Sequence, residues 1–576
     1  MIKQFLFFFN RHHKQSLILL FIFMFIATFF EMVGLGFIFS IVGALTSVSA
    51  ANNVFIDKLS IFFELDKTEI LSYLLFIFFF FYLFKIIFLT FYAWFMSSFL
   101  YRYREYLSSK VFKEYLNQNF SYFYNRNSSE FIRNLITEID QFNGWLLAIL
   151  IGTLETIILI GIITVLAYIN LYFAISISSL FLSFFALYFF LLRKKLNTWG
   201  VQRQKSVQKR IQFMQEVFDG IKTIKLLGRE NFFFNKFKFH NVNLSRLAHL
   251  SYFFSGVPKL LVEFLGIVCI TFSIFILHHS GKNLFEITQI LSVYVAASFR
   301  ILPSINKITF SLHQIKLFRP AISVLYKELK SFKKEKHSEN NEKFSFNKNI
   351  FINIEKFKYP NSNNFEISDV KLNISKGEKI GIIGASGSGK STVVEILTGI
   401  SDQPKGNIMV DEKSIYSNLK EWQKLIGFVP QRIFILDESL RNNILFGLDR
   451  KKYTDDMILS MLKKISLENL LKRLPNGLDG NLGEKGINLS GGEIQRIGLC
   501  RALIYDPEIL FLDEATSSLD VDTESQILNE LKIFKEKTII SIAHRINTLK
   551  NCEKIYSFDK GKIIDQGNYD KFKIQS

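Results

Sequence analysis

The sequence predicts a membrane domain built from a bundle of α-helices, followed by an α/β domain. Hydrophobic residues make up 49% of the 576 residues, which is more than a water-soluble fold of this size requires. In the first half they stand in runs longer than the ~20 residues that cross a bilayer. In the last part, short strand patterns alternate with helical ones, as in helices packed around a mainly parallel sheet.

Six apolar segments are long enough to span a membrane. The connections after the second and fourth segments are long and rich in Lys and Arg, whereas the others are short and poor in both. Because basic loops stay on the cytoplasmic side and the number of segments is even, both chain ends are expected in the cytoplasm. Helical periodicity continues past the second and fourth segments, so these helices should project beyond the bilayer. The six segments are 16–45, 70–100, 144–170, 171–192, 257–278 and 285–310.

The net charge of +19 raises the possibility of nucleic-acid binding. The basic residues, however, crowd the segments that flank the apolar runs, as at Arg102, Arg104 and 193–195. This distribution is typical of the cytoplasmic loops of a membrane protein. The three cysteines are too few and too widely spaced for a disulfide framework or a zinc site. We therefore expect an integral membrane protein without a nucleic-acid partner.

Composition also predicts the domain boundaries. Residues 1–330 contain the apolar segments, and residues 331–349 are polar and indicate a linker. Residues 350–576 form the predicted α/β domain. It opens with FINIEKFKYP, whose alternation of apolar and polar residues is typical of an edge strand.

A short amphipathic helix is predicted between the first two membrane segments. Four of its aromatic and aliphatic side chains recur at helical spacing and share one face. The helix either lies on the outer membrane surface or packs against its own protein. The residues of this face are Phe55, Leu59, Phe62 and Phe63.

The strongest local signal is a glycine-rich loop between a strand and a helix. The strand pattern KIGIIG precedes the loop GASGSGKS, and the helical pattern STVVEILTG follows it. Glycines let backbone N–H groups face phosphates, and the helix N-terminus adds positive potential. Lys390 should reach the β- and γ-phosphates of a nucleotide, and the Ser391 hydroxyl should bind Mg²⁺. The predicted nucleotide-binding residues are Gly384, Ala385, Ser386, Gly387, Ser388, Gly389, Lys390, Ser391 and Thr392.

A second apolar strand pattern, EILFLDE, ends in Asp513 and Glu514. Two acids at the end of a buried strand suit two roles beside a phosphate loop. Asp513 is expected to hold Mg²⁺ and its water, and Glu514 is expected to act as a general base. A structural salt bridge would account for one of these acids but rarely for both.

The run LSGGEIQR, residues 489–496, reveals a family resemblance. Together with Gln431 in FVPQ, SSLD at 517–520 and His544 in SIAHR, it resembles the ATPases of the ABC transporters. The resemblance extends along the whole chain and implies that the nucleotide is ATP. It also implies that the membrane domain belongs to an exporter, because the membrane part precedes the ATPase part.

The resemblance assigns further residues of the ATP site. In this family the LSGG loop caps the γ-phosphate of ATP that is held by the partner domain, which implies an ATP-binding role for Ser490, Gly491, Gly492 and Glu493. Glu493 stands where the family most often has Gln. Tyr359 in FKY should stack on the adenine.

Three more roles follow from the same resemblance. Gln431 should sense Mg²⁺ and the attacking water, and His544 should hold the γ-phosphate and orient Glu514. The stretch LGEKG around Glu484 resembles the segment through which exporters signal between their ATPase and membrane parts.

Each chain has one phosphate loop and one LSGG loop. If each ATP lies between the two kinds of loop from opposite domains, two chains are needed, and we expect a homodimer. A heterodimer with a related half is the alternative. The segments Asn125–Asp140 and Glu216–Glu230 resemble cytoplasmic turns that dock onto the ATPase domains and carry their closure into the long helices.

The transported substrate is indicated by cations within the apolar spans, where charged groups are costly and usually functional. Lys85, Lys259 and Arg300 would line a central cavity, and in a dimer their six charges would suit an anionic phosphate group. The alternative is that these cations pair with acids in the spans, or that Lys259 extends to the membrane surface. The acids available for pairing are Glu31, Glu155 and Glu263.

The membrane part resembles bacterial flippases of lipid-linked oligosaccharides in its EMVGLG, VPKLLVE and SFRILPSINKI segments. This implies a polyprenyl-pyrophosphate-linked oligosaccharide that moves to the periplasmic leaflet of the bacterial inner membrane, for protein glycosylation or O-antigen assembly. The alternatives are an exporter of peptides, drugs or another lipid, and a regulatory ABC protein or gated channel. The intact catalytic positions argue against the last two.

Overall fold

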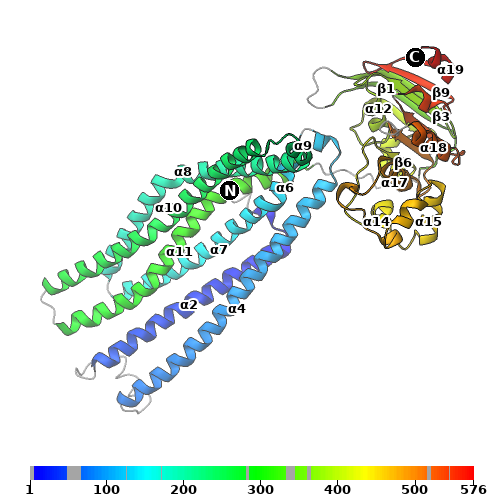
Figure 1. The fold of residues 1–576 in the computed structure, drawn as a ribbon. Coiled ribbons are helices and arrows are strands. Elements are labelled where there is room, and N and C mark those ends of the chain that lie inside the picture. Colours follow the sequence, from blue (N-terminus) through cyan, green and yellow to red (C-terminus); the bar gives the residue numbers. More distant parts are fainter. Residues whose placement is uncertain are drawn as a thin grey trace. The chain divides into compact units, whose positions relative to one another are not determined.

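The structure is a computed structural model of the chain, and it divides into two compact units (Figure 1). Unit 1 comprises Met1–Gln118 and Arg126–Lys333, and unit 2 comprises Asn119–Asn125 and Lys334–Ser576. The structure describes residues 6–47, 67–124, 126–169, 171–279, 284–332, 344–359, 365–515, 521–543 and 545–575.

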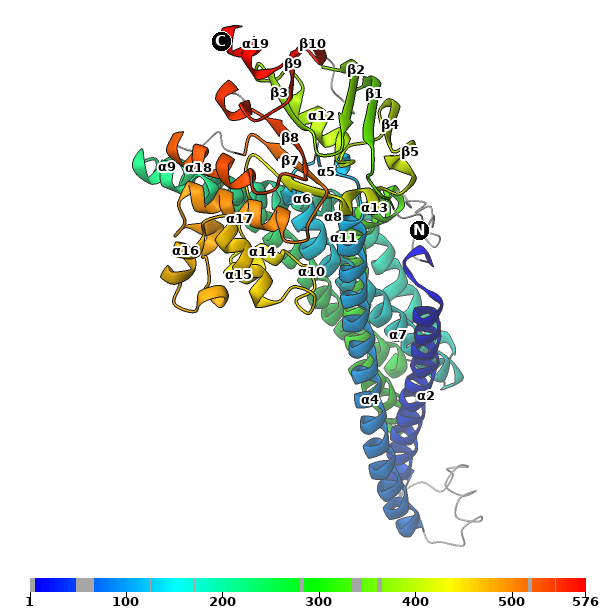
Figure 2. The same ribbon diagram turned by 90° about the vertical axis from the view of Figure 1, so that its right-hand side faces the viewer.

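Unit 1 consists of long helices and a few short helical elements. The long helices are α2 (Arg11–Ser47), α4 (Lys67–Leu116), α7 (Ile139–Ile169), α8 (Leu171–Asp219), α10 (Glu230–His279) and α11 (Leu284–Ser331). The α11 helix packs against α7, α8 and α10, and α2 packs against α4 and α7. Figures 1 and 2 both show α2 and α4 side by side. The short elements are α6 (Ser128–Arg133), a π-helical turn at Asn134–Glu138 and α9 (Ile221–Leu226).

The predicted membrane spans fall within these long helices, apart from residue 170, which lies outside the described residues. The α4 and α8 helices run on to Leu116 and Asp219, so their predicted continuation past the apolar segments is confirmed. Four helical segments among the described residues are long and apolar enough to cross a membrane. They are Arg11–Phe37, Leu75–Leu116, Ser128–Tyr168 and Glu230–Val268. The predicted amphipathic helix with Phe55, Leu59, Phe62 and Phe63 lies outside the described residues.

The outer faces of these helices carry large apolar side chains. Phe25, Phe29, Phe76 and Phe84 are each at least 58% exposed. Exposure of apolar area to water costs about 25 cal/mol per Å², whereas the same area contacts the hydrocarbon of a bilayer without this cost. Helices also suit a bilayer because their backbone N–H and C=O groups form hydrogen bonds within the helix. The surface chemistry of unit 1 therefore agrees with a membrane domain.

Unit 2 contains a six-stranded sheet with strand order β10-β9-β3-β8-β7-β6. The five strands from β9 to β6 are parallel, and β10 is antiparallel to β9. The prediction of an α/β domain with a mainly parallel sheet is therefore confirmed. The strands are β3 (Lys379–Gly384), β6 (Ile426–Val429), β7 (Ile509–Asp513), β8 (Thr538–Ile542), β9 (Lys554–Asp559) and β10 (Lys562–Gly567).

A second, antiparallel sheet has the strand order β2-β1-β4-β5. Its strands are β1 (Asn349–Phe357), β2 (Ile367–Ser375), β4 (Lys405–Val410) and β5 (Lys413–Ser414). The predicted strand after residue 350 is present as β1, but its predicted edge position is wrong, because β1 pairs with both β2 and β4. Its alternating pattern arises because an antiparallel sheet packs one face on the core and exposes the other.

The helices of unit 2 surround these sheets. They are α5 (Ser121–Tyr124), α12 (Lys390–Leu397), α13 (Leu419–Lys424), α14 (Leu440–Leu445), α15 (Asp455–Lys464), α16 (Glu468–Arg473), α17 (Gly491–Leu503), α18 (Val521–Leu531) and α19 (Tyr569–Gln575). The α12 helix follows β3 directly, and α17 packs against β6. The glycine-rich loop follows β3, Gln431 follows β6 and Glu514 follows β7, so these predicted site residues lie at the carboxyl ends of parallel strands.

Candidate ATP site and membrane-domain cavity

The glycine-rich loop connects β3 to α12 as predicted, and its glycines adopt conformations that other residues avoid. The φ angles of Gly384, Gly387 and Gly389 are 151°, 79° and 107°. A Cβ atom on Gly384 would lie 2.2 Å from the carbonyl oxygen of Phe558. These values explain why the loop needs glycine at these positions.

The loop has groups suited to phosphate. Lys390 is 4% exposed, and its Nζ donates to the carbonyl oxygens of Gly384 and Ala385, each 3.0 Å away. Burial lowers the pKa of Lys390, while the nearby Glu514 and Asp513 act in the opposite direction. The buried Ser388 Oγ has no hydrogen-bond partner among the described residues. An unpartnered hydroxyl and a buried amine at a helix N-terminus fit the phosphates of ATP.

Two oxygen ligands for a metal meet at the end of β7. The Ser391 hydroxyl donates to Asp513 Oδ1 at 3.3 Å, and burial raises the pKa of Asp513. A bound cation would offset the cost of keeping this carboxylate charged. Mg²⁺ prefers such hard oxygen ligands together with the phosphates of its nucleotide. The residues therefore fit the predicted Mg²⁺.

Glu514 follows Asp513 in an uncommon backbone conformation. Its φ is +49°, in the left-handed region, where strain is common at functional sites. Its N–H donates to the Ile542 oxygen at 3.1 Å, which fixes the turn against β8. Its Oε2 accepts a hydrogen bond from Gln431 Nε2 at 2.5 Å. The predicted base and the predicted water-sensing amide are thus in contact.

Tyr359 lies against α12 and beside α5. Its hydroxyl donates to Glu395, and its ring contacts the edge of Phe357 and stacks on Tyr124. Burial, followed by the hydrogen bond to Glu395, raises the pKa of Tyr359. Sequence reasoning missed Glu395, although it lies four residues after Ser391 and so on the same face of α12. It also missed Tyr124, for which local sequence carries no signal.

The LSGG loop lies at the start of α17. The Ser490 side chain caps the helix and accepts from the Glu493 N–H at 3.2 Å, and Glu493 Oε2 accepts from the Ser490 N–H at 2.7 Å. Arg473 adds an ion pair to Glu493 at 3.0 Å. The Glu at this position therefore completes a capping box and binds a cation. Ser490 and Gly491 are exposed.

The structure brings only part of the predicted ATP site together. Ser391, Asp513, Glu514 and Gln431 form one group at the phosphate loop. Within the described ranges no hydrogen bond or ion pair connects Ser490, Gly491 or Gly492 to that loop. His544 and the SSLD residues 517–520 lie outside the described residues.

The cations predicted for the membrane domain are paired with acids. Lys85 Nζ lies 3.0 Å from Glu31 Oε2. Arg300 lies 3.2 Å from Glu31 and 3.6 Å from Glu155. Lys307 Nζ, which sequence reasoning missed, lies 2.6 Å from Glu155. These five residues connect α2, α4, α7 and α11, so the pairing alternative describes Lys85 and Arg300 in this structure.

Lys259 stands apart from this network. Its distance to Glu263 is 4.0 Å, and the two side chains are 64% and 48% exposed, so this ion pair contributes little. Lys259 and Lys307 line a cavity of about 520 Å³ between α4, α7, α10 and α11, with Glu155 as its one acid. Its other lining residues include Met96, Leu154, Pro258, Asn306 and Phe310.

Known families match both parts of the chain. The ABC transporter transmembrane region matches residues 17–302, and the ABC transporter ATPase family matches residues 367–517. The fold is similar to a bacterial Atm1-family ABC exporter with ATP bound, with a TM-score of 0.81, 17% identity, and coverage of 98% of this chain and 97% of that one.

Individual relatives match over parts of their length. A putative export ATP-binding/permease protein of Rickettsia bellii is 38% identical over 216 residues, 37% of each chain. An ATP-dependent lipid A-core flippase of Methylobacillus flagellatus is 26% identical over 380 residues, 66% of this chain and 64% of that one. A probable multidrug resistance ABC transporter of Bacillus subtilis is 37% identical over 207 residues, 36% of this chain and 30% of that one. The chain thus spans less than two thirds of the length of these relatives. Both halves of the chain nevertheless match ABC transporter families. The chain therefore belongs to the ABC transporters, with a transmembrane region and an ATPase domain.

Proposed function

We propose that the chain is one half of a homodimeric, ATP-driven flippase for a polyprenyl-pyrophosphate-linked oligosaccharide. The membrane domain, residues 1–330, crosses a bacterial inner membrane six times. The linker, 331–349, and the ATPase domain, 350–576, lie in the cytoplasm with both chain ends. The cargo moves from the cytoplasmic to the periplasmic leaflet.

The grouping of catalytic side chains at the end of β7 is the observation that carries the ATPase part of this proposal. Glu514 accepts the hydrogen bond from Gln431, and Asp513 lies within 3.3 Å of the Ser391 hydroxyl. Gln431 orients a water, and Glu514 takes its proton as the water attacks the γ-phosphate of ATP. Ser391, Asp513 and the Gln431 carboxamide oxygen would hold Mg²⁺, which would neutralise charge at the phosphates.

The LSGG loop supports the proposal of a homodimer. Ser490 and Gly491 are exposed, and the capping box leaves the α17 N-terminus preformed. A helix N-terminus with a free face attracts the γ-phosphate of ATP bound to a second copy. Since each copy has both loops, two copies form two equivalent sites.

The cavity of about 520 Å³ supports an anionic lipid cargo. Lys259 and Lys307 line it together with one acid, Glu155, so the lining keeps a net positive charge. A pyrophosphate fits this excess, whereas an uncharged drug would leave it uncompensated. The likeness to a lipid A-core flippase also favours a phosphorylated glycolipid. The second candidate, a drug or peptide exporter, is favoured by the likeness to a multidrug resistance transporter.

A flipping assay in proteoliposomes tests the proposal. The purified protein is reconstituted with a fluorescent polyprenyl-pyrophosphate oligosaccharide, and the label that remains accessible at each leaflet is measured with and without ATP. The proposal is supported if the lipid moves in an ATP-dependent way and if Lys259→Gln and Lys307→Gln slow this movement. Lys327→Gln, which lies on α11 as Lys307 does, is the control and should leave the movement unchanged. ATP hydrolysis without movement of this lipid contradicts the assigned cargo and favours the second candidate.

A further inference from the structure

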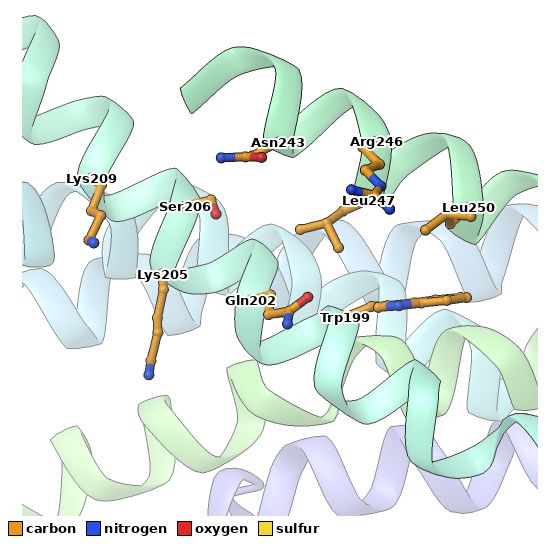
Figure 3. A pocket seen from close by; sticks show the side chains of 9 residues that line it. All are labelled: Trp199, Gln202, Lys205, Ser206, Lys209, Asn243, Arg246, Leu247 and Leu250. Carbon is orange, nitrogen blue, oxygen red and sulfur yellow. The ribbon is translucent and has the colours of Figure 1, made fainter. Parts of the chain in front are cut away.

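A charged side chain contributes to a site where its neighbours hold it in one place. The cavity of about 550 Å³ between α8 and α10 of unit 1 does not meet this condition. In Figure 3, Lys205 and Lys209 extend away from α10, and Arg246 lies at the opposite, apolar end. These cations therefore share no common point at which a ligand would bind. Glu395 of unit 2 is different, because its carboxylate has a fixed partner.

Glu395 lies on α12, the helix that follows the phosphate loop, and it is the one acid of this helix. Its side chain is half-buried. The residues of α12 that face the core are at most 1% exposed, and they are Val393, Val394, Ile396 and Leu397. Glu395 lies one turn after Ser391, so it belongs to the same face of the helix as this proposed Mg²⁺ ligand. The acid therefore lies on the site side of α12 and not on its core side.

The Glu395 carboxylate accepts a hydrogen bond from the hydroxyl of Tyr359. Tyr359 lies two residues after the end of β1, so this hydrogen bond connects the antiparallel sheet to α12. Phe357 contacts the Tyr359 ring with its edge, with ring centroids 5.1 Å apart. A ring that is held only by such apolar contacts can tilt, whereas a ring that is also anchored at its hydroxyl keeps one plane.

A salt bridge does not explain the acid at this position. Among the described residues Glu395 forms no ion pair, and the hydrogen bond from Tyr359 is the only one that its carboxylate accepts. Its charge is even unfavourable for the metal site. Burial is the main cause that raises the pKa of Asp513, and the nearby charges of Glu514 and Glu395 raise it further. What the carboxylate provides is a strong acceptor, because an ionised acceptor forms a stronger hydrogen bond than a neutral one.

We propose that Glu395 is a positioning residue for recognition of the nucleotide base. It holds the hydroxyl of Tyr359 and thereby fixes the plane of the ring on which adenine stacks, without touching the nucleotide itself. This inference rests on the proposed contact between Tyr359 and adenine. It implies that Glu395 acts on the base of ATP and leaves the phosphates to Lys390 and Ser391.

Steady-state ATP hydrolysis by the full-length protein in nanodiscs tests this role with two ligands. ATP carries the base, whereas tripolyphosphate, used as an inhibitor, carries phosphates alone. Glu395→Leu removes the hydrogen-bond acceptor from α12. The KM for ATP should rise about three- to tenfold, a part of the value of one stacked base, while kcat and the inhibition constant of tripolyphosphate stay within about twofold.

Matched variants separate the hydrogen bond from the charge. Glu395→Gln removes the charge near Asp513 as Glu395→Leu does, but its amide oxygen still accepts from Tyr359, so the KM should stay near the wild-type value. Tyr359→Phe removes the same hydrogen bond from the other side. It should raise the KM as Glu395→Leu does, and the double variant should raise it no further. Tyr416→Phe is the control, since the Tyr416 hydroxyl donates to the Ile396 oxygen of α12 at 3.5 Å, and it should leave the KM unchanged.

Three results would overturn the inference. The first is an unchanged KM in Glu395→Leu, and the second is an equal rise of the KM and of the tripolyphosphate inhibition constant, which would show that the phosphate loop itself is disturbed. The third is that the effects of Glu395→Leu and Tyr359→Phe add. Thermal unfolding temperatures of all variants show whether they are folded.

Tyr359→Ala distinguishes a failure of this inference from a failure of the contact on which it rests. An unchanged KM in Tyr359→Ala would contradict the stacking of adenine on Tyr359. A raised KM in Tyr359→Ala together with a normal KM in Glu395→Leu would contradict only the role of Glu395.

Discussion

The ring of Tyr124 lies parallel to the ring of Tyr359 in unit 2, with centroids 4.8 Å apart and 4° between the ring planes. Tyr124 ends the short helix α5, and Tyr359 is the residue expected to stack on adenine. The Tyr359 hydroxyl is held by Glu395, so its ring cannot turn freely. A ring face that Tyr124 covers is not accessible to adenine.

Replacement of Tyr124 tests this relationship. If adenine uses the covered face, Tyr124→Ala removes a competitor, and the KM for ATP should fall about two- to tenfold, as expected for the loss of one aromatic contact. The measurement is steady-state ATP hydrolysis at varied ATP. Tyr122→Ala, in the same helix, is the control, since Tyr122 packs on Phe123. An unchanged or higher KM in Tyr124→Ala would show that adenine uses the other face.

Glu514 and Gln431 provide a second prediction. Glu514→Gln keeps the size of the side chain but removes the base, so kcat should fall about 10²- to 10⁴-fold while ATP binding persists. Single-turnover hydrolysis and the binding of a fluorescent ATP analogue measure the two effects separately. Glu508→Gln changes a half-buried acid just before β7 that pairs with Lys376, and it is the matched control. Hydrolysis near the wild-type rate in Glu514→Gln would exclude its role as the base.

Two glycines of the phosphate loop should respond differently to the same change. Gly384→Ala places a Cβ 2.2 Å from a backbone oxygen at φ 151°, so the loop must move and the thermal unfolding temperature should fall markedly. Gly387→Ala meets no atom within 4 Å and only strains its φ of 79°, which costs about 1 kcal/mol. Unfolding followed by differential scanning fluorimetry compares them. Equal unfolding temperatures would contradict the packing argument.

The local parts of the site were predictable from sequence, and the long-range parts were not. The loop 384–391 and the pair Asp513 and Glu514 stand beside strand and helix patterns that fix where they must lie. The contact between Tyr124 and Tyr359 joins residues far apart in the chain, as does the pair Glu31 and Lys85. Periodicity shows which face of a helix is apolar, but it does not show which other helix packs there.

The edge strand illustrates the same limit. Alternation in residues 351–357 indicated a strand with one exposed face, and β1 has that character. Whether such a strand lies at an edge depends on its neighbours, and β2 and β4 occupy both sides. The candidate ATP site can be located from sequence because short motifs carry its chemistry, whereas the cavities depend on helix packing.

The capping box of α17 predicts a pH dependence of stability. Burial alone would raise the pKa of Glu493, but hydrogen bonds from the Ser490 N–H and from Arg473 outweigh it and lower the pKa below its ordinary value of 4.5. Because the folded pKa is depressed, Glu493 stabilises the fold above the unfolded pKa, and this contribution is lost as the pH falls through the folded pKa. Glu493→Gln lacks this contribution. The difference in unfolding temperature between wild type and Glu493→Gln should therefore shrink from pH 7 to pH 4, and a constant difference would contradict it.

The paired charges of unit 1 give the last prediction. Glu31 lies against both Lys85 and Arg300, so Glu31→Gln leaves the buried Lys85 without its acid, while Arg300 keeps only Glu155. Removal of one partner from a buried pair costs about 3 to 5 kcal/mol. Glu31→Gln should lower the unfolding temperature more than Lys85→Met, because Glu31 keeps Arg300 as its partner in the latter. The double variant Glu31→Gln, Lys85→Met should recover part of the loss. Lys259→Met, whose pair is exposed, should change stability by at most about 1 kcal/mol. If the single and double variants lose stability additively, the pair does not interact, and Lys85 is then available to an anionic cargo.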